Sequence, residues 1–216
     1  MKSIFLIVAL LVLNSCGEAD KKEVSQKNFT RVLNDYYARD CIGINLSATF
    51  PLYEKENLKH EIDAKYLEFE KLGLVKLTDA EFDYNKEIKK RGGLHFRDLS
   101  KVDMVKGKKV ELTEKGKKIY KLLDSKSSYQ KAKFCLAYYE VLEITNYTKP
   151  ESVMGMTIAR VNYTAKPMNV VSFIDEITKI KSFDYFKNKT TKEISTRADL
   201  ILTEMKGWVH SREFKR

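Results

Sequence analysis

An apolar run near the N-terminus separates a leader from the part of the chain that can fold. Ten successive apolar residues occupy positions 4–13, shortly after Lys2. A helix that crosses a bilayer needs about 20 residues, whereas a run of this length after a positive charge is typical of a secretory signal peptide. We therefore expect residues 1–15 to be a signal peptide that is removed.

The run ends in Leu13-Asn14-Ser15-Cys16, which resembles the lipobox of bacterial lipoproteins. The family pattern prefers Ala, Ser or Thr where Asn14 stands. The resemblance implies a diacylglycerol on the sulfur of Cys16, cleavage after Ser15, and acylation of the new amine. Buried acyl chains contribute about 0.8 kcal/mol per CH₂, so two or three chains hold a protein stably on a membrane. The alternatives are a conventional cleaved signal, or a short membrane helix with an incidental cysteine.

A signal peptide delivers the chain to an extracytoplasmic compartment of the bacterial envelope, which is the periplasm or the cell surface. Cys41 and Cys135 are then the two remaining cysteines. Two cysteines in an oxidising compartment often pair, so we predict a disulfide between them. The alternative is a pair of buried thiols, because cysteine also behaves as a small apolar residue. Neither cysteine belongs to a C-x-x-C motif, which argues against a thioredoxin-like role.

Composition indicates a folded protein of one large or two small domains. The chain has 216 residues, 43% hydrophobic and 32% charged, with only 9 Gly and 3 Pro. These values exclude collagen-like, low-complexity and wholly disordered classes. Residues 16–26 are mostly polar and are predicted to be a lipidated tether that leads to the folded part.

Residues 27–130 are predicted to form a mainly helical domain. Apolar residues recur at helical spacing in 27–39 and 54–72, and Thr113 can cap a further helix over 114–124. Short strands are expected at 74–77 and 109–112, with a long loop between them.

The phrases LEFEKLGLV (67–75) and VELTEKGKKIY (110–120) resemble winged-helix domains. In that family a helix ends in Gly-Leu-Val, a β-wing follows, and a strand ends in Leu-Thr-x-x-Gly. The resemblance implies a winged-helix-like fold for this half of the chain.

Residues 131–216 are predicted to form an α+β domain with a small antiparallel sheet. Residues 138–147 and 154–164 are rich in β-branched and aromatic residues and read as an antiparallel pair of strands. A helix is expected over 168–181 and a last strand over 197–205. The fold class is therefore α+β, with a winged-helix-like half followed by a sheet with one or two helices.

Short phrases in this second half resemble small periplasmic lipoproteins of the carbapenem-intrinsic-resistance type. They are Phe134-Cys135, two strands that carry Asn-Tyr-Thr, and LTEMKGW (202–208). Members of that family are non-enzymatic periplasmic proteins, and no catalytic residue transfers from it.

The sequence offers little catalytic or metal-binding chemistry. His60, His95 and His210 are far from one another and from cysteine in sequence, so no metal or cofactor site is predicted. His95, in the expected loop, is the one histidine weighed for a functional role. No nucleotide-binding or hydrolase motif is present, which makes an enzyme the less favoured interpretation.

Positive charge is concentrated in residues 86–133, which hold 16 Lys and Arg against 6 Asp and Glu. Fourteen of the sixteen are Lys, whereas DNA base recognition favours Arg. We expect either an ordinary solvated surface or a surface for anionic lipid or another anionic polymer of the envelope. The residues chosen for that surface are Lys89, Lys90, Arg91, Lys108 and Lys109.

Three functions remain open at this stage. The first is a lipoprotein held in the membrane through Cys16, with a non-enzymatic binding or accessory role in the envelope. Its partners would be the membrane, an envelope protein, or an anionic lipid or polymer, and no nucleic acid. The second is an envelope hydrolase or polymer-modifying enzyme whose site is assembled from distant residues, and the third is a winged-helix DNA-binding protein.

Overall fold

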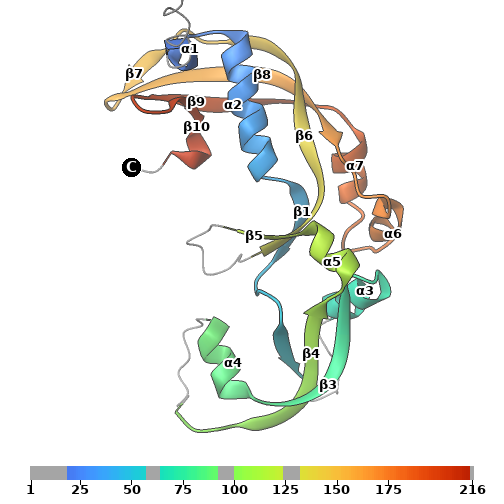
Figure 1. Ribbon diagram of the computed structural model, residues 1–216. Coiled ribbons are helices and arrows are strands. Elements are labelled where there is room, and N and C mark those ends of the chain that lie inside the picture. The colour runs from blue at the N-terminus through green and yellow to red at the C-terminus, as the bar shows by residue number, and fades with distance from the viewer. Residues whose placement is uncertain (1–18, 57–63, 92–99, 124–131, 215–216) are drawn as a thin grey trace, which may run out of the picture. The chain divides into compact units, whose positions relative to one another are not determined.

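Antiparallel strands and short helices alternate along the chain, so the fold class is α+β, as the sequence predicts. A computed structural model describes residues 19–56, 64–91, 100–123 and 132–214 (Figure 1). Within these ranges no helix has both the length and the apolar character that a membrane crossing requires. The chain divides into two compact units, which are not consecutive in sequence. Unit 1 holds residues 1–40, 138–168 and 191–216, and unit 2 holds residues 41–137 and 169–190.

Unit 1 is built from both ends of the chain and from the long strands between them. In chain order its elements are α1 (Ala19–Lys22), α2 (Gln26–Arg39), the second part of β6 (Ala132–Tyr147), β7 (Glu151–Val153), β8 (Met156–Met168), β9 (Ile194–Thr203), β10 (Gly207–His210) and the 3-10 helix η1 (Ser211–Glu213). The strands are antiparallel and follow the order β6-β8-β9-β10, with β7 on β8.

Helix α2 forms where the sequence predicts it, because its apolar residues lie on one side. The side chain of Ser25 accepts a hydrogen bond from the backbone N–H of Asn28 and so caps the first turn. The buried side of the helix packs on the sheet. The core that results contains Phe29, Val32, Leu33, Tyr36, Tyr37, Val141, Ile144, Ala159, Val161, Tyr163, Ala165, Ala198, Leu200 and Trp208.

Small residues on the sheet let the helix approach closely. From β8 the core takes three small residues, Ala159, Val161 and Ala165, beside the larger Tyr163, and further large side chains come from α2 and β10. Phe29 contacts Trp208 edge to face, with ring centroids 5.4 Å apart. Edge-to-face aromatic pairs are favourable beyond the area that they bury, so this contact fixes the start of α2 against β10.

In its described residues, unit 2 contains mostly short strands and five helices. In chain order its described elements are β1 (Ile42–Leu46), β2 (Leu52–Lys55), α3 (Ala64–Lys71), β3 (Val75–Asp83), α4 (Tyr84–Arg91), β4 (Met104–Leu112), α5 (Glu114–Ile119), β5 (Tyr120–Leu122), the first part of β6, α6 (Ile174–Thr178) and α7 (Phe186–Thr191). Strands β1 and β5 pair with β6, while β2, β4 and β3 form a separate three-stranded antiparallel sheet in that order.

Three stacked or perpendicular phenylalanines form the centre of unit 2. The ring of Phe69 on α3 lies 5.1 Å from that of Phe134 on β6, and 5.8 Å from the parallel ring of Phe183. Phe69 and Phe134 are fully buried. The predicted disulfide between Cys41 and Cys135 is confirmed, with 5.5 Å between the two Cα atoms.

The prediction of a long loop over 78–108 is wrong for the residues that the structure describes. Strand β3 continues to Asp83, α4 follows at once, and β4 begins at Met104. One carboxylate oxygen of Asp83 accepts backbone N–H groups from Asn85, Lys86 and Asp103. The hydrogen bond from the backbone N–H of Asp103 is the main reason why the pKa of Asp83 is lowered, and the other two hydrogen bonds add to it. A single aspartate therefore starts α4 and fixes the return to β4.

A winged-helix domain is not shown by the described residues. Helix α2, which the resemblance places in the same domain as 110–120, belongs to unit 1, whereas those residues belong to unit 2. The helix predicted over 54–72 is described only as α3, because Glu54 and Lys55 lie in β2 and 57–63 lie outside the described residues. What the region does contain is a three-stranded sheet whose first strand, β2, precedes α3 and whose other two strands, β3 and β4, follow it.

Two helices are shorter than the sequence predicts, because residues expected at one end of each belong to the neighbouring strand, β5 or β8. The helix capped by Thr113 is confirmed but ends at Ile119, where β5 begins. Strand β8 extends to Met168, so the helix expected over 168–181 is reduced to α6. The predicted antiparallel pair of strands is confirmed as β6 and β8, and the last predicted strand corresponds to β9.

Candidate functional site

A group of aromatic and polar side chains lies where the end of α2 meets β8, β10 and η1 in unit 1. We call it the tyrosine–histidine cluster and define it as Tyr36, Tyr37, Tyr139, Tyr163 and His210. Tyr36, Tyr37, Tyr163 and His210 are buried, although each carries a polar group. Buried polar groups require partners, so the contacts of these side chains show what the cluster can do.

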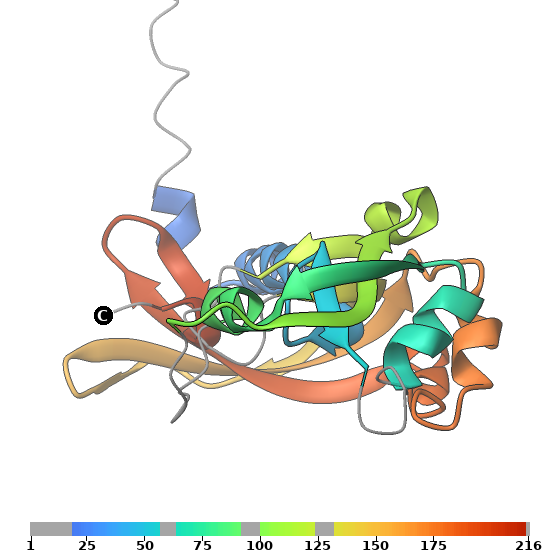
Figure 2. The ribbon, with the colours of Figure 1, turned by 90° about the horizontal axis from the view of Figure 1, so that it is seen from below.

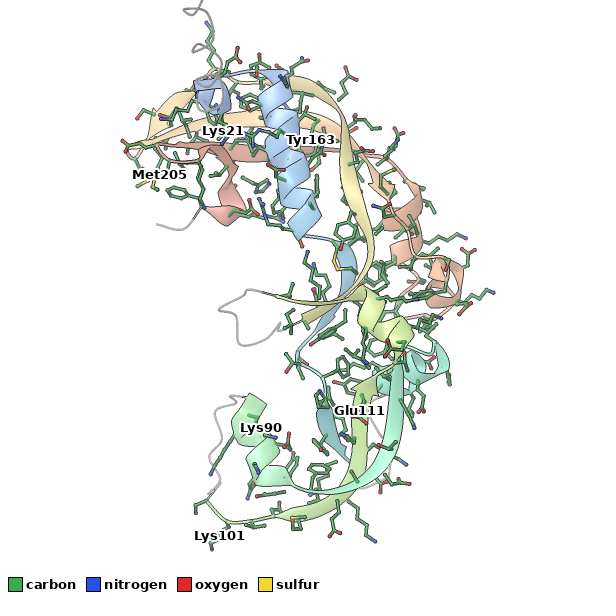
Figure 3. The ribbon with its side chains drawn as sticks, viewed as in Figure 1. Lys21, Lys90, Lys101, Glu111, Tyr163 and Met205 are labelled. Carbon is green, nitrogen blue, oxygen red and sulfur yellow. A yellow bond between two sulfur atoms is a disulfide. The ribbon has the colours of Figure 1, made fainter. Side chains whose placement is uncertain are left out.

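Direct contacts connect the members of the cluster. The hydroxyl groups of Tyr37 and Tyr163 share a buried hydrogen bond of 2.7 Å, and Figure 3 labels Tyr163 within the sheet of unit 1. The rings of Tyr37 and Tyr139 lie 5.3 Å apart. The ring of Tyr36 stacks on the imidazole of His210, with centroids 3.9 Å apart and an interplanar angle of 12°. The cluster thus joins α2 to three strands.

Charged groups at the edge of the cluster hold the Tyr36 hydroxyl. It donates to Asp40 at 2.7 Å and accepts from the guanidinium of Arg212 at 3.1 Å. Burial raises the pKa of Tyr36 to about 12, and the hydrogen bond to Asp40 adds to the effect. Burial raises the pKa values of Tyr37 and Tyr163 as well. All three phenols therefore stay protonated at neutral pH.

His210 is also uncharged at neutral pH. Burial lowers its pKa, and the nearby positive charge of Arg212 lowers it further. Its Nδ1 accepts the backbone N–H of Arg212 at 3.1 Å, which also starts η1. A neutral imidazole that accepts at Nδ1 carries its proton on Nε2. The cluster is thus a set of neutral hydrogen-bonding groups that fixes helix to sheet.

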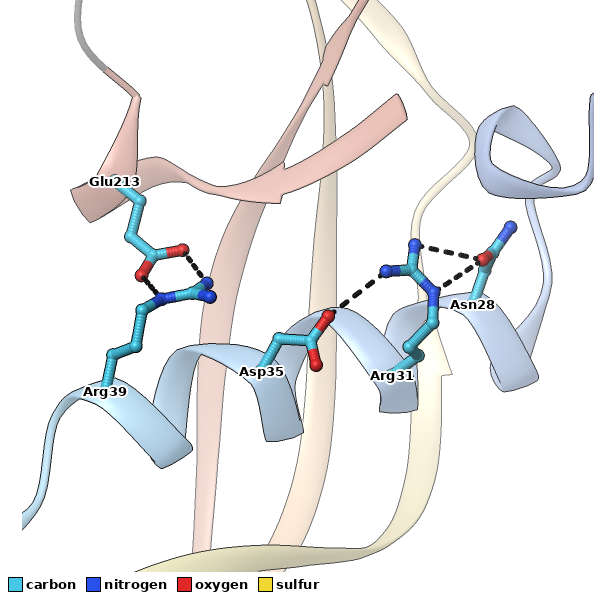
Figure 4. A network of polar contacts seen from close by, with 5 residues as sticks. All are labelled: Asn28, Arg31, Asp35, Arg39 and Glu213. Carbon is cyan, nitrogen blue, oxygen red and sulfur yellow. Dashed lines mark hydrogen bonds and ion pairs between the residues drawn. The ribbon is translucent and has the colours of Figure 1, made fainter. Parts of the chain in front are cut away.

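Ion pairs continue from the cluster along the exposed side of α2 (Figure 4). The guanidinium of Arg39 makes two hydrogen bonds to the carboxylate of Glu213, at 2.6 and 2.7 Å. Arg31 donates to the side-chain oxygen of Asn28 and to Asp35. Paired contacts of this geometry are stronger than single ones, so the end of α2 is held to η1 at the surface as well as in the core.

The predicted anion-binding residues belong to two elements of unit 2. Lys89, Lys90 and Arg91 lie on α4, and the side chain of Arg91 lies outside what the structure describes. Lys90 pairs with Glu87 at 2.5 Å. Lys108 and Lys109 lie on β4 and are only partly exposed.

Acidic partners reduce the positive potential of these lysines. Lys108 pairs with Asp79 of β3, and Lys109 pairs with Glu111 at 2.7 Å. The hydrogen bond to the carboxylate is the main reason why the pKa of each lysine is raised. Directly opposite residues of the β3–β4 register also include Glu81 and Lys106. The net charge that the sequence concentrates in 86–133 is therefore offset in part by the neighbouring strand.

Three candidates from the sequence lie outside the described residues: Cys16, His60 and His95. Of the histidines, only His210 can be placed, and it is the one the sequence gave least reason to choose. The sequence predicted no function for the residues of the tyrosine–histidine cluster. A usable signal was present in the adjacent pair Tyr36-Tyr37, because two neighbouring tyrosines on one helix bring two hydroxyls that need partners.

Among the described residues, no group of three or more His, Cys, Asp or Glu side chains is arranged to hold a metal ion. The chain matches no protein-family model, no curated protein and no solved structure. The function must therefore be argued from the residues and their geometry alone.

Proposed function

We propose that the protein is a lipoprotein of the bacterial envelope, held in a membrane through Cys16, with a binding or accessory role in the envelope. The disulfide between Cys41 and Cys135 supports an extracytoplasmic location, because disulfides persist in oxidising compartments. The lipobox-like sequence Leu13-Asn14-Ser15-Cys16 supports the lipid attachment.

The packing of α1 on β10 is the observation that most supports a position beside the membrane. The indole N–H of Trp208 donates to the backbone carbonyl of Lys22 at 3.0 Å. At Gly207 an added Cβ would lie 2.4 Å from the carbonyl oxygen of Lys21. The segment expected to be a free tether is therefore packed on β10 from Lys21 onward. Only four residues separate Lys21 from Cys16, so a lipid on Cys16 keeps unit 1 beside the bilayer.

A binding role fits the chemistry of unit 1 better than catalysis does. The cluster that most resembles a polar site is neutral, and its hydroxyl groups bond to one another or to Asp40 and Arg212. An envelope enzyme remains the alternative function, with a site that would include residues such as His95. A winged-helix protein that binds DNA is the other alternative, and its resemblance rests on residues of unit 2.

In unit 2 we propose a subsidiary contact with anionic lipid or polymer. Lys89, on the exposed side of α4, is the best placed of the predicted residues, since Lys90, Lys108 and Lys109 each pair with a carboxylate. Exposed charges act over about 8 Å at physiological ionic strength. This contact is therefore expected only at close approach.

Metabolic labelling with a clickable fatty acid tests the main proposal. The wild-type chain should take up the label and sediment with membranes, because Cys16 is acylated. The Cys16→Ala variant should lose the label and remain an uncleaved precursor. A Cys41→Ala/Cys135→Ala variant is the matched control and should keep the label. Label retained on Cys16→Ala, or no label on the wild type, would overturn the proposal.

A further inference from the structure

Two hairpin turns extend from neighbouring strands at one end of unit 1. The first joins β7 to β8, where Val153 pairs with Met156. The second joins β9 to β10, where Thr203 pairs with Gly207. Thr157 of β8 pairs with Leu202 of β9, so the two turns extend from neighbouring strands in the same direction. Figures 1 and 2 show both turns at the end of unit 1 that also carries α1.

Each turn presents an exposed methionine. Met154 is 86% exposed and Met205 is 90% exposed, and Val153 beside them is 45% exposed. Figure 3 labels Met205 at the tip of its turn. Single exposed apolar residues are common on proteins, but large and almost fully exposed side chains gathered at one end indicate a contact surface. Methionine is frequent at such surfaces because its side chain adapts to different partners.

The backbone of the first turn makes Met154 more unusual. Met154 has φ +52° and Gly155 has φ +77°, so both central residues adopt the left-handed conformation. Two-residue hairpin turns of this kind favour Asn-Gly, because Asn tolerates the conformation and a long side chain does not. The chain therefore keeps an exposed apolar side chain at a position where asparagine would fit the fold better. Local strain of this kind points to a function for the side chain.

Charges around the two turns are mixed: exposed Glu23, Glu151 and Glu204 lie near exposed Lys21, Lys22 and Lys206. Met205 lies between Glu204 and Lys206, both exposed. Lys21 and Lys22 on α1 are exposed close to the second turn, because Lys21 packs against Gly207. Apolar tips with neighbouring lysines suit the boundary between acyl chains and anionic headgroups.

The position of the predicted lipid brings this end of unit 1 to a bilayer. The five residue-to-residue steps from Cys16 to Lys21 span at most about 17 Å. The β9–β10 turn adjoins β10, on which Lys21 packs, and the β7–β8 turn extends from β8, which pairs with the neighbouring strand β9. A short link raises the effective concentration of a second contact, so even a weak interaction between the turns and lipid is populated once the anchor is in place.

We propose that the β7–β8 and β9–β10 turns form a membrane-contact surface, in which Met154 and Met205 enter the boundary region of the bilayer that holds the lipid anchor. Lys21, Lys22 and Lys206 contact anionic headgroups. The inference rests on the proposed lipoprotein function. It adds that unit 1 has a fixed face toward the membrane.

Oxidation of methionine by hydrogen peroxide tests this surface in the lipidated protein. Samples reconstituted in vesicles with anionic lipid are compared with the unlipidated chain from residue 17 in solution, and sulfoxide formation is followed by mass spectrometry of peptides. Met154 and Met205 should oxidise at least about fivefold more slowly in vesicles, because lipid covers them. Met104 of β4, which is 54% exposed, is the internal control and should not change. Equal rates at Met154 and Met205 in both samples would overturn the inference.

A second measurement keeps the inference separate from the lipid anchor. The unlipidated chain should bind vesicles with anionic lipid weakly, and a Met154→Asn/Met205→Asn variant should bind about tenfold less tightly because apolar burial is lost. Asparagine is favoured at the position of Met154 in such a turn, so the double variant should keep the fold. Met104→Asn is the matched control. Unchanged binding of the double variant would contradict the surface. Absence of fatty-acid label on the wild-type chain in the separate labelling experiment, with the difference in vesicle binding still present, would contradict only the lipoprotein proposal.

Discussion

The two units of this protein obtain their stability in different ways. Unit 1 lays one long helix on long strands around a continuous apolar core, and adds a neutral tyrosine–histidine cluster at the end of the helix. Unit 2 has shorter elements, three contacting phenylalanines, and a disulfide. The difference shows that a covalent link is used where elements are short, and core packing is used where they are long.

Loss of the disulfide should have the largest effect and should fall on unit 2. A Cys41→Ala/Cys135→Ala variant removes a cross-link between residues 94 positions apart, which is worth about 4.5 kcal/mol in the chain-entropy model. Hydrogen exchange followed by mass spectrometry should show faster exchange in β3 and β4 than in β8 and β9. Trp208 is the single tryptophan and lies in unit 1, so its fluorescence reports on that unit alone. Equal destabilisation of both regions would mean that the units unfold together.

Truncation of a core phenylalanine should have a slightly smaller effect on stability. The effect should fall on unit 1 in one variant and on unit 2 in its matched counterpart. Phe29→Ala in unit 1 and Phe69→Ala in unit 2 each remove a fully buried ring, at a cost of about 4 kcal/mol. Phe29→Ala should shift the fluorescence transition of Trp208 in urea, because the two rings touch. Phe69→Ala should change exchange in unit 2 and leave that transition nearly in place. The opposite pattern would contradict the division into units.

Tyr37→Phe should cost about 1 to 2 kcal/mol of unfolding free energy in unit 1, since it leaves the buried hydroxyl of Tyr163 without its partner. The urea midpoint monitored by Trp208 measures the change. Tyr185→Phe is the control in unit 2, because Tyr185 is 48% exposed, and should have no effect. If Tyr37→Phe is as stable as the wild type, the cluster does not stabilise the end of α2.

The smallest predicted effect is a dependence of unit 1 on pH. The pKa of His210 is lowered from 6.5 in the folded protein, so the unfolded chain binds more protons below that pH. The contribution of His210 is therefore complete above about pH 6.5 and decreases as the pH falls toward the folded pKa. Urea midpoints from Trp208 should be lower at pH 5.5 than at pH 7.5.

The variant His210→Asn tests whether the histidine causes this dependence. Asparagine keeps an acceptor for the N–H of Arg212 but does not titrate in this range. The variant should therefore lose part of the pH dependence. An unchanged dependence would assign it to other groups.

Local patterns in the sequence predicted local elements well. Helix α2, the cap at Thr113, the β6–β8 pair and the disulfide follow from periodicity, capping chemistry and cysteine usage. Most of strands β3 and β4 was missed, and a loop was predicted over 78–108 instead. The polar residues there form strands with charged side chains of both signs, which do not show the apolar pattern expected of a strand. The tyrosine–histidine cluster was missed because it joins residues as far apart in sequence as Tyr36 and His210. No periodicity within a single segment records such a contact.

The non-consecutive composition of unit 1 has a consequence for the order of synthesis. Helix α2 ends at Arg39, whereas β9 begins at Ile194 and β10 ends at His210. At about 5 to 20 residues per second, the ribosome needs roughly 10 to 30 seconds to make the intervening chain. Every residue of unit 2 has been made by position 190. The apolar side of the N-terminal helix therefore waits for the last residues of the chain, and a ribosome that stops before Gly207 leaves that helix without Trp208 to cover it.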